Sequence, residues 1–303
     1  MGADSAKVVD APRPAGGAIE LVPRTSGQIL DAALDLARTR MGLYVLVATI
    51  VWLVARGLQP LIGLSALEDE MFGDNSSYVL LLVAFNGVVQ FVIESLALVA
   101  VTVFAWPAVT GTEFSLGASI RRALLCLVPV VGLQLVASLA VLPALFCTCG
   151  IGGIYLSWKF TLAPIVYTVE RAGFGASIGR SFQLSSQNGS GWDAIAGFLR
   201  WLCVYGSAYV VGMAFKGVAG IVDQPAFRIS LRDGLGLSEL AFDSLTIVVT
   251  SFFNGIASVL IALALLAYYL DCRVRRDGLD LRVRLATLES ETASAPGAAT
   301  APV

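Results

Sequence analysis

Long apolar stretches with few charges dominate this sequence and decide the solvent in which it can fold. We predict six membrane-spanning helices from them, at residues 41–64, 78–106, 123–146, 151–170, 194–221 and 241–271. A helix needs roughly 20 mostly apolar residues to cross a bilayer, and these stretches have that length. Hydrophobic residues make up 57% of the chain and charged residues 14%, whereas soluble domains contain about 25% charged residues. The predicted fold class is an all-α, polytopic helical bundle in a membrane.

The fourth stretch, at residues 151–170, is the least regular of the six. Gly150, Gly152, Gly153 and Pro164 lie in it or at its start. Because Gly and Pro weaken a helix, a re-entrant segment is the alternative interpretation. That alternative would make the number of spans odd and place the two termini on opposite sides of the membrane.

Basic residues distribute unequally between the two predicted sides. The predicted outer segments carry only Lys216, Arg228 and Arg232, the first outer loop at 68–74 is acidic, and the other Lys and Arg of the connecting segments fall on the inner side. This asymmetry follows the positive-inside rule and predicts six spans with both termini in the cytoplasm. We assign residues 22–288 to one membrane domain and predict disordered tails at 1–21 and 289–303 from their composition.

Three predicted inner segments resemble one another. They precede the first, third and fifth spans, at residues 25–34, 115–124 and 174–184. Residues 117–122 and 175–180 share Gly-Ala-Ser-Ile-x-Arg, and Thr25 with Gln28 forms a capping-box pattern. We predict three hairpins of spans, each preceded by an amphipathic helix at the cytoplasmic interface. The alternative is a chance similarity in Ala-rich sequence.

Three short motifs, at residues 25–31, 179–185 and 269–280, resemble one bacterial family. It is the membrane domain named after glycerophosphoryl diester phosphodiesterase, and the resemblance covers roughly residues 22–288. The last motif supplies the family-like residues Tyr269, Asp271, Arg273, Gly278 and Asp280. The resemblance implies a non-catalytic, multi-pass protein of the bacterial cytoplasmic membrane.

The sequence departs from the family pattern at several positions. Leu270 replaces a second tyrosine, Asp277 replaces a glutamate, and residues 187–190 replace a more basic stretch. The phosphodiesterase domain itself is absent, because its chemistry uses histidines and this chain has none.

Several classes of chemistry are excluded by what the sequence lacks. Without histidine there is no Ser-His-Asp or Cys-His catalysis and no His-ligated metal. Cys147 and Cys149 form a lone C-x-C, which is more typical of packing than of metal or redox chemistry. No phosphate-binding loop is present, and the net charge of −2 argues against nucleic acid as a partner. We therefore predict no enzyme activity, no cofactor and no metal.

A polar cluster is predicted near the middle of the membrane. Its members are Asn86, Gln90, Glu94, Gln134, Lys159 and Asn254. The first three recur at i, i+4 and i+8 and so share one helix face. A charge at this depth costs at least about 2.5–3.5 kcal/mol on insertion scales, so we predict that Glu94 pairs with Lys159. The cluster is interpreted either as a site for a proton, ion or lipid headgroup, or as hydrogen-bonding glue between helices.

Basic residues cluster on the predicted cytoplasmic side. They are Arg121, Arg122, Arg171, Arg180, Arg273, Arg275 and Arg276. Such residues attract anionic lipid headgroups by about 1 kcal/mol each, or they serve only to set topology.

Taken with the resemblance, these features predict a membrane scaffold or accessory module that acts on lipids or on a protein partner. The alternative is a small transporter or lipid scramblase that uses the polar cluster around Glu94 and Lys159.

Overall fold

The computed structural model of the chain describes residues 23–58, 76–186, 191–224 and 238–278, together with isolated positions between 225 and 237. The described residues form helices and contain no strand. The helices are α1 (Ser26–Leu58), α3 (Ser76–Thr110), α4 (Leu116–Cys147), α5 (Ile151–Phe160), α6 (Ala163–Glu170), α7 (Phe174–Ser186), α8 (Gly191–Asp223) and α10 (Glu239–Asp277). The tails at 1–21 and 289–303 and most of the loop before α10 lie outside the described residues.

Five of the described helices are long and apolar enough to cross a membrane. The segments are Ser26–Gly57, Val92–Thr110, Leu116–Cys147, Trp192–Val222 and Ala241–Asp277. The prediction of an all-helical protein with several membrane-spanning helices is confirmed at this level.

The predicted fourth span is divided into two short helices, α5 and α6. Thr161 and Leu162 join them with helical backbone angles, and Pro164 lies in the first turn of α6. Proline has no N–H to donate to the preceding turn, which explains the break. Neither α5 nor α6 alone reaches the length of a span, so the predicted count of six is not confirmed.

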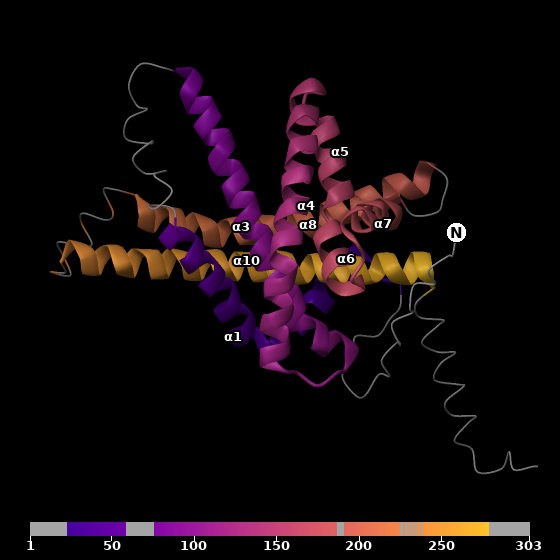
Figure 1. Cartoon of the computed structure of the whole chain (residues 1–303), viewed down its shortest axis with the longest axis horizontal. Helices are drawn as coiled ribbons and strands as arrows, with labels where there is room; N and C mark the ends of the chain where they lie inside the picture. The colour runs from indigo at the N-terminus through magenta and orange to yellow at the C-terminus, as the bar shows by residue number, and fades with distance from the viewer. Residues whose placement is uncertain are drawn as a thin grey trace, which may run out of the picture.

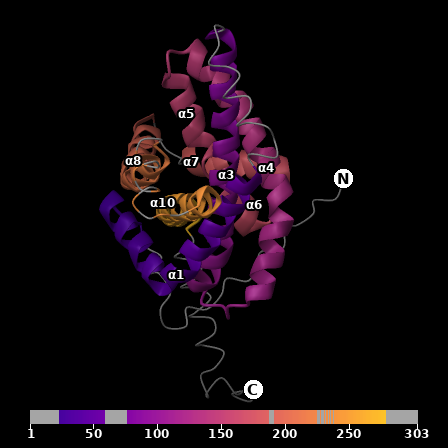
Figure 2. The same ribbon diagram turned by 90° about the vertical axis from the view of Figure 1, so that its left-hand side faces the viewer.

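Helix α10 occupies the centre of the molecule and runs along its longest axis (Figure 1). Helix α8 lies beside it, and α4 and α5 run across this pair. Figure 2 shows α10 close to end-on, with α1, α3 and α8 around it. The segment from Ala262 to Leu270 on α10 is buried throughout, because α1, α3 and α8 all pack against it. The arrangement as three hairpins remains a prediction.

Large apolar side chains are exposed along α4 and α8. Leu125 is 68% exposed, Val128 74% and Phe146 73%, and Val210 on α8 is 68% exposed. A soluble monomer rarely exposes apolar surface of this extent, whereas lipid tails accommodate it. The outer surfaces of α4 and α8 therefore suit a bilayer.

The three similar inner segments adopt three different structures. The first is the start of α1, which bends at Arg40, where the backbone leaves the helical region. Its capping box is confirmed: Thr25 N–H donates to Gln28 Oε1 at 2.9 Å, and Gln28 N–H donates to Thr25 Oγ1 at 3.4 Å. The bend at Arg40 adjoins the predicted start of the first span at residue 41.

The second inner segment is continuous with the long helix that follows it, whereas the third forms a helix of its own. Ser115 caps the N-terminus of α4, and the segment continues into the long helix without a break. A separate interfacial helix is therefore not formed there, since nothing between residues 117 and 123 interrupts helical hydrogen bonding. The third segment forms the separate helix α7, whose buried residues are Ser177, Ser181, Leu184 and Ser185.

Candidate functional site

Asp271 ties the last helix to two distant parts of the chain. Its carboxylate accepts hydrogen bonds from the Arg24 backbone N–H at 2.8 Å, from Arg275 Nε at 2.9 Å and from Arg200 Nη1 at 3.4 Å. The Asp271 side chain is fully buried. A buried carboxylate is stable only when it is paired and hydrogen-bonded, and these three donors meet that requirement. Asp271 thereby joins α10 to α8 and to the segment before α1.

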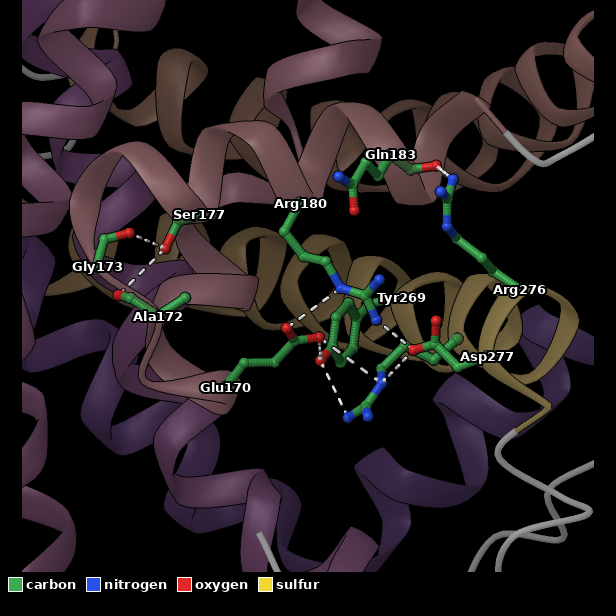
Figure 3. Close-up of polar contacts among 10 residues, drawn as sticks. Glu170, Ala172, Gly173, Ser177, Arg180, Gln183, Tyr269, Arg276 and Asp277 are labelled. Carbon is green, nitrogen blue, oxygen red and sulfur yellow. Dashed lines mark hydrogen bonds and ion pairs between the residues drawn. The ribbon is translucent and has the colours of Figure 1, made fainter. Parts of the chain in front are cut away.

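Tyr269 and Arg273 lie one turn apart on a different face of α10 and contact the end of α6. The Tyr269 hydroxyl donates to Glu170 Oε1 at 2.8 Å (Figure 3). Arg273 Nε lies 3.7 Å from the same Glu170 oxygen. Buried tyrosines usually place their hydroxyl on a partner, and here the partner is the last residue of α6.

Asp277, one turn further along α10, extends this network to α7. It accepts from Arg273 Nε at 3.3 Å and forms an ion pair with Arg180. Arg180 also contacts Glu170 Oε2 at 3.3 Å, and Arg276 donates to the backbone carbonyl of Gln183 (Figure 3). We call Glu170, Arg180, Tyr269, Arg273 and Asp277 the α6–α7–α10 network.

Gly278 ends α10 in the left-handed conformation, with φ of +58°. Its N–H donates to the carbonyl of Val274 at 3.1 Å, which is the usual way a glycine closes a helix. Asp280 lies outside the described residues. Four of the five family-like motif residues therefore have structural partners or a capping role.

The predicted lipid-contacting arginines are mostly engaged within the protein. Arg180, Arg273, Arg275 and Arg276 have the partners given above, and Arg122 donates to the Thr168 carbonyl on α6. Arg121 and Arg171 are exposed. Arg171 caps α6 in the left-handed conformation with φ of +52°.

The ion pair predicted between Glu94 and Lys159 is not formed, because each side chain has another partner. Glu94 Oε1 contacts the ammonium of Lys216 on α8. Lys159 donates to Ser186 Oγ at 2.7 Å and lies 4.0 Å from the centroid of the Trp158 ring. Equal depth in the membrane does not make two residues neighbours, since the helix faces must also turn toward each other.

A cavity of about 300 Å³ lies beside Glu94. Helices α3, α4, α5, α8 and α10 all contribute side chains, and Thr161 adds one from the turn after α5. The lining residues are Glu94, Ser95, Leu98, Gln134, Ala137, Val141, Ile154, Ser157, Phe160, Thr161, Trp201, Tyr205, Ser258, Ile261 and Leu265. Ligand sites in proteins have this character, with mostly apolar walls, a few polar groups and volumes of about 300–1,000 Å³.

One polar group in the cavity wall is fully buried and has no hydrogen-bond partner among the described residues. It is the indole N–H of Trp201. Buried polar groups are nearly always paired, so this N–H is available to a ligand or to water. The Gln134 amide, on a residue that is 8% exposed, also lines the cavity.

Four aromatic rings form a ladder along α8. Trp201 and Tyr205 stack with centroids 5.3 Å apart and an interplanar angle of 5°. Phe198 and Tyr209 extend the ladder at 5.8 Å on either side. These residues recur at three and four positions, which keeps them on one helix face.

Of the other members of the predicted polar cluster, Gln90, Lys159 and Asn254 are not among the described residues that line the cavity. Asn254 is buried and donates to the Thr250 carbonyl one turn earlier at 2.9 Å. Gln90 is half-buried, and the side chain of Asn86 lies outside the described residues. The structure thus brings together Glu94 and Gln134 from the predicted set.

Sequence reasoning missed Trp201, Tyr205 and the role of Lys216. The helical spacing of the aromatic residues on α8 is a signal that could have identified the ladder. Lys216 was assigned to the outer side, although it lies inside a candidate span.

The described residues contain no group of three or more His, Cys, Asp or Glu that could hold a metal ion. Cys147 and Cys149 are free and exposed. Cys149 and Gly150 both have positive φ and form the tight turn between α4 and α5.

Comparison with protein-family models, with curated proteins and with solved structures finds no match to this chain.

Proposed function

We propose that this chain is a multi-pass protein of a bacterial cytoplasmic membrane that acts without catalysing a reaction, as a scaffold or accessory module for lipids or for a protein partner. The observation that carries the proposal is the engagement of the motif residues with one another. Asp271 and the α6–α7–α10 network hold α10 against α6, α7, α8 and the segment before α1. Side chains that pair with one another across several helices hold those helices in a fixed arrangement, as a scaffold requires. The resemblance to the membrane domain named after glycerophosphoryl diester phosphodiesterase belongs to the same proposal.

The proposed topology has six spans with both termini in the cytoplasm. Its support at the fourth span is that Thr161 and Leu162 keep helical angles between α5 and α6. The test is cysteine accessibility in intact cells. In the proposed topology, and in an otherwise cysteine-free chain, Cys149 before α5 reacts with an impermeant maleimide from outside, whereas a cysteine replacing Ala176, which is exposed on α7 after α6, reacts only after lysis. Equal reactivity of both positions from one side would overturn the six-span topology.

A second candidate function is transport or lipid scrambling, and the cavity beside Glu94 favours it. A carboxylate in a largely apolar cavity within candidate spans is the usual mark of a substrate or ion pathway. The scaffold proposal rests instead on the network at the C-terminal end of α10.

One assay separates the two candidates. Purified protein in proteoliposomes is tested for movement of ions and of labelled lipid, beside Glu94→Gln and the control Glu113→Gln, which changes an exposed acid away from the cavity. Flux that is lost in Glu94→Gln and kept in Glu113→Gln favours transport. Absence of flux in the wild type, together with a partner captured by crosslinking in cells, favours the scaffold.

A further inference from the structure

We propose that the cavity beside Glu94 binds the polar end of an amphiphile that carries an ammonium group and an acceptor oxygen. The inference rests on the proposed membrane function, because it names the class of molecule on which that function acts. Aminophospholipid headgroups and free amphiphilic amines share this chemistry.

The charge of the cavity points to a cation. Among the described lining residues Glu94 is the one charged group, and none is lysine or arginine. Lys216 contacts Oε1 of Glu94 but does not line the cavity. A carboxylate can accept hydrogen bonds on both oxygens, so Glu94 has the capacity to accept from an ammonium group in addition to Lys216. The Glu94 side chain remains 31% exposed, which leaves it accessible.

The unpaired indole N–H points to an acceptor on the same ligand. The indole N–H of Trp201 can only donate, so its partner must be an oxygen or another acceptor. Gln134, which also lines the cavity, can both donate and accept. A phosphate or ester oxygen close to an ammonium group could accept from both side chains.

The walls and the size fit the polar end of an amphiphile. The parallel rings of Trp201 and Tyr205 offer aromatic surface, which attracts ammonium groups through cation–π interactions. Leu98, Ile261 and Leu265 supply aliphatic surface for the start of a chain. A volume of about 300 Å³ equals that of about ten liquid water molecules and suits a headgroup.

The test is a binding measurement by native mass spectrometry on the full chain, released from maltoside micelles. The probes are dihexanoyl phosphatidylethanolamine, dihexanoyl phosphatidylglycerol and hexylammonium. The first two have the same chains, and the second lacks the ammonium group. We expect phosphatidylethanolamine to bind with a Kd about tenfold or more below that of phosphatidylglycerol.

Three variants connect binding to the cavity. Glu94→Gln is expected to raise the Kd for phosphatidylethanolamine about tenfold, whereas Glu113→Gln leaves it unchanged. Trp201→Phe keeps an aromatic ring at this position and removes the N–H, so it weakens the binding of phosphatidylethanolamine while leaving the binding of hexylammonium unaffected. If Glu94→Gln does not fold, Gln134→Leu replaces it, because that change removes a polar group without leaving Lys216 unpaired.

Several results would overturn the proposal. They are equal binding of both lipids, no binding of any probe, and wild-type binding by Glu94→Gln or by its substitute Gln134→Leu. Binding of phosphatidylethanolamine without hexylammonium identifies a lipid headgroup as the ligand, whereas binding of hexylammonium alone, which has no acceptor oxygen, also overturns the proposal. This binding measurement depends neither on flux across a membrane nor on a protein partner. Its result therefore tests the ligand proposal separately from the scaffold and transport candidates.

Discussion

The ammonium of Lys216 on α8 contacts the carboxylate of Glu94 on α3, in a chain where these residues are 122 positions apart. Both side chains are largely buried, with 17% and 31% of their surface exposed. Lys216 also lies 6.0 Å from the centroid of the Trp52 ring on α1. The pair therefore fixes α3 and α8 relative to each other at the edge of the cavity.

A double-mutant cycle measures this pairing. Glu94→Leu and Lys216→Leu each leave a charge without its partner, so each should lower the midpoint of thermal unfolding in detergent. The double variant should be more stable than the sum of the two losses predicts, by about 0.5–3 kcal/mol. The same cycle with Lys159→Leu in place of Lys216→Leu should be additive. Additivity in the first cycle would show that the Glu94–Lys216 contact contributes nothing.

Asp271→Asn should be among the most destabilising single changes in the chain. The variant removes the charge that Arg200 and Arg275 share inside the protein, and loss of a buried ion-pair partner costs about 3–5 kcal/mol. The matched control is Asp35→Asn. Asp35 pairs with Arg38 on the surface, where both side chains are mostly exposed, and such a pair contributes about 0–1 kcal/mol. Equal unfolding midpoints for the two variants would contradict the role given to Asp271.

Gly255→Ala tests the close approach of α1 and α10. A Cβ atom at Gly255 would lie 2.9 Å from the backbone nitrogen of Thr49 and 2.6 Å from its Oγ1. The backbone of α1 cannot yield without moving the helix, so we expect a loss of about 1–3 kcal/mol in unfolding free energy. Small residues at such crossings are typical of membrane helices.

The control for this substitution is Gly206→Ala on α8. Apart from the adjoining backbone of α8, no heavy atom of the described residues lies within 4 Å of the Cβ that would be added there. Because alanine favours a helix over glycine by about 0.5–1 kcal/mol, Gly206→Ala should leave stability unchanged or raise it. If both variants behave alike, the helix crossing is looser than described.

Lys159→Met tests whether the buried ammonium is needed for folding. Lys159 is 2% exposed and has the neutral hydroxyl of Ser186 as its hydrogen-bond partner. Ser186 itself donates to the Phe182 carbonyl at 2.7 Å and keeps that bond in the variant. Methionine preserves packing against Trp158 without a desolvated charge, so the unfolding free energy should stay the same or rise by about 1–4 kcal/mol. A clear fall would indicate that the charge on Lys159 has a stabilising partner.

The fold class and several helix boundaries could be predicted because they depend on local sequence. The change from polar to apolar residues near residue 41 predicted the start of the first span, and the structure bends α1 at Arg40. The Thr25–Gln28 capping box was predicted from two residues and is formed. In both cases the structure depends on interactions between residues that are within one or two helical turns of each other in the sequence.

The partners of the charged residues could not be predicted in the same way. Helical spacing places Asp271 and Arg275 on one face of α10 and Tyr269, Arg273 and Asp277 on another. It does not predict that Arg24 lies opposite the first face or that Glu170 lies opposite the second. The pairing of Glu94 failed for this reason, since depth along a helix is readable from the sequence and rotation about its axis is not. The segment that begins at Ser115 shows the converse limit, because it resembles the segment that forms the separate helix α7 and yet continues into α4 without a break.

The position of α10 at the centre of the molecule has a consequence for biosynthesis. Helix α1 leaves the ribosome first and packs most extensively against α10, which leaves last. The hydrogen bond from Arg24 to Asp271 spans 247 positions, and at 5–20 residues per second that interval corresponds to roughly 12–50 s of translation. During this time α1 resides in the membrane without its main packing partner. Loss of the last helix by a premature stop would therefore remove the helix against which α1 and α8 pack most, and we expect membrane proteases to degrade the shortened chain.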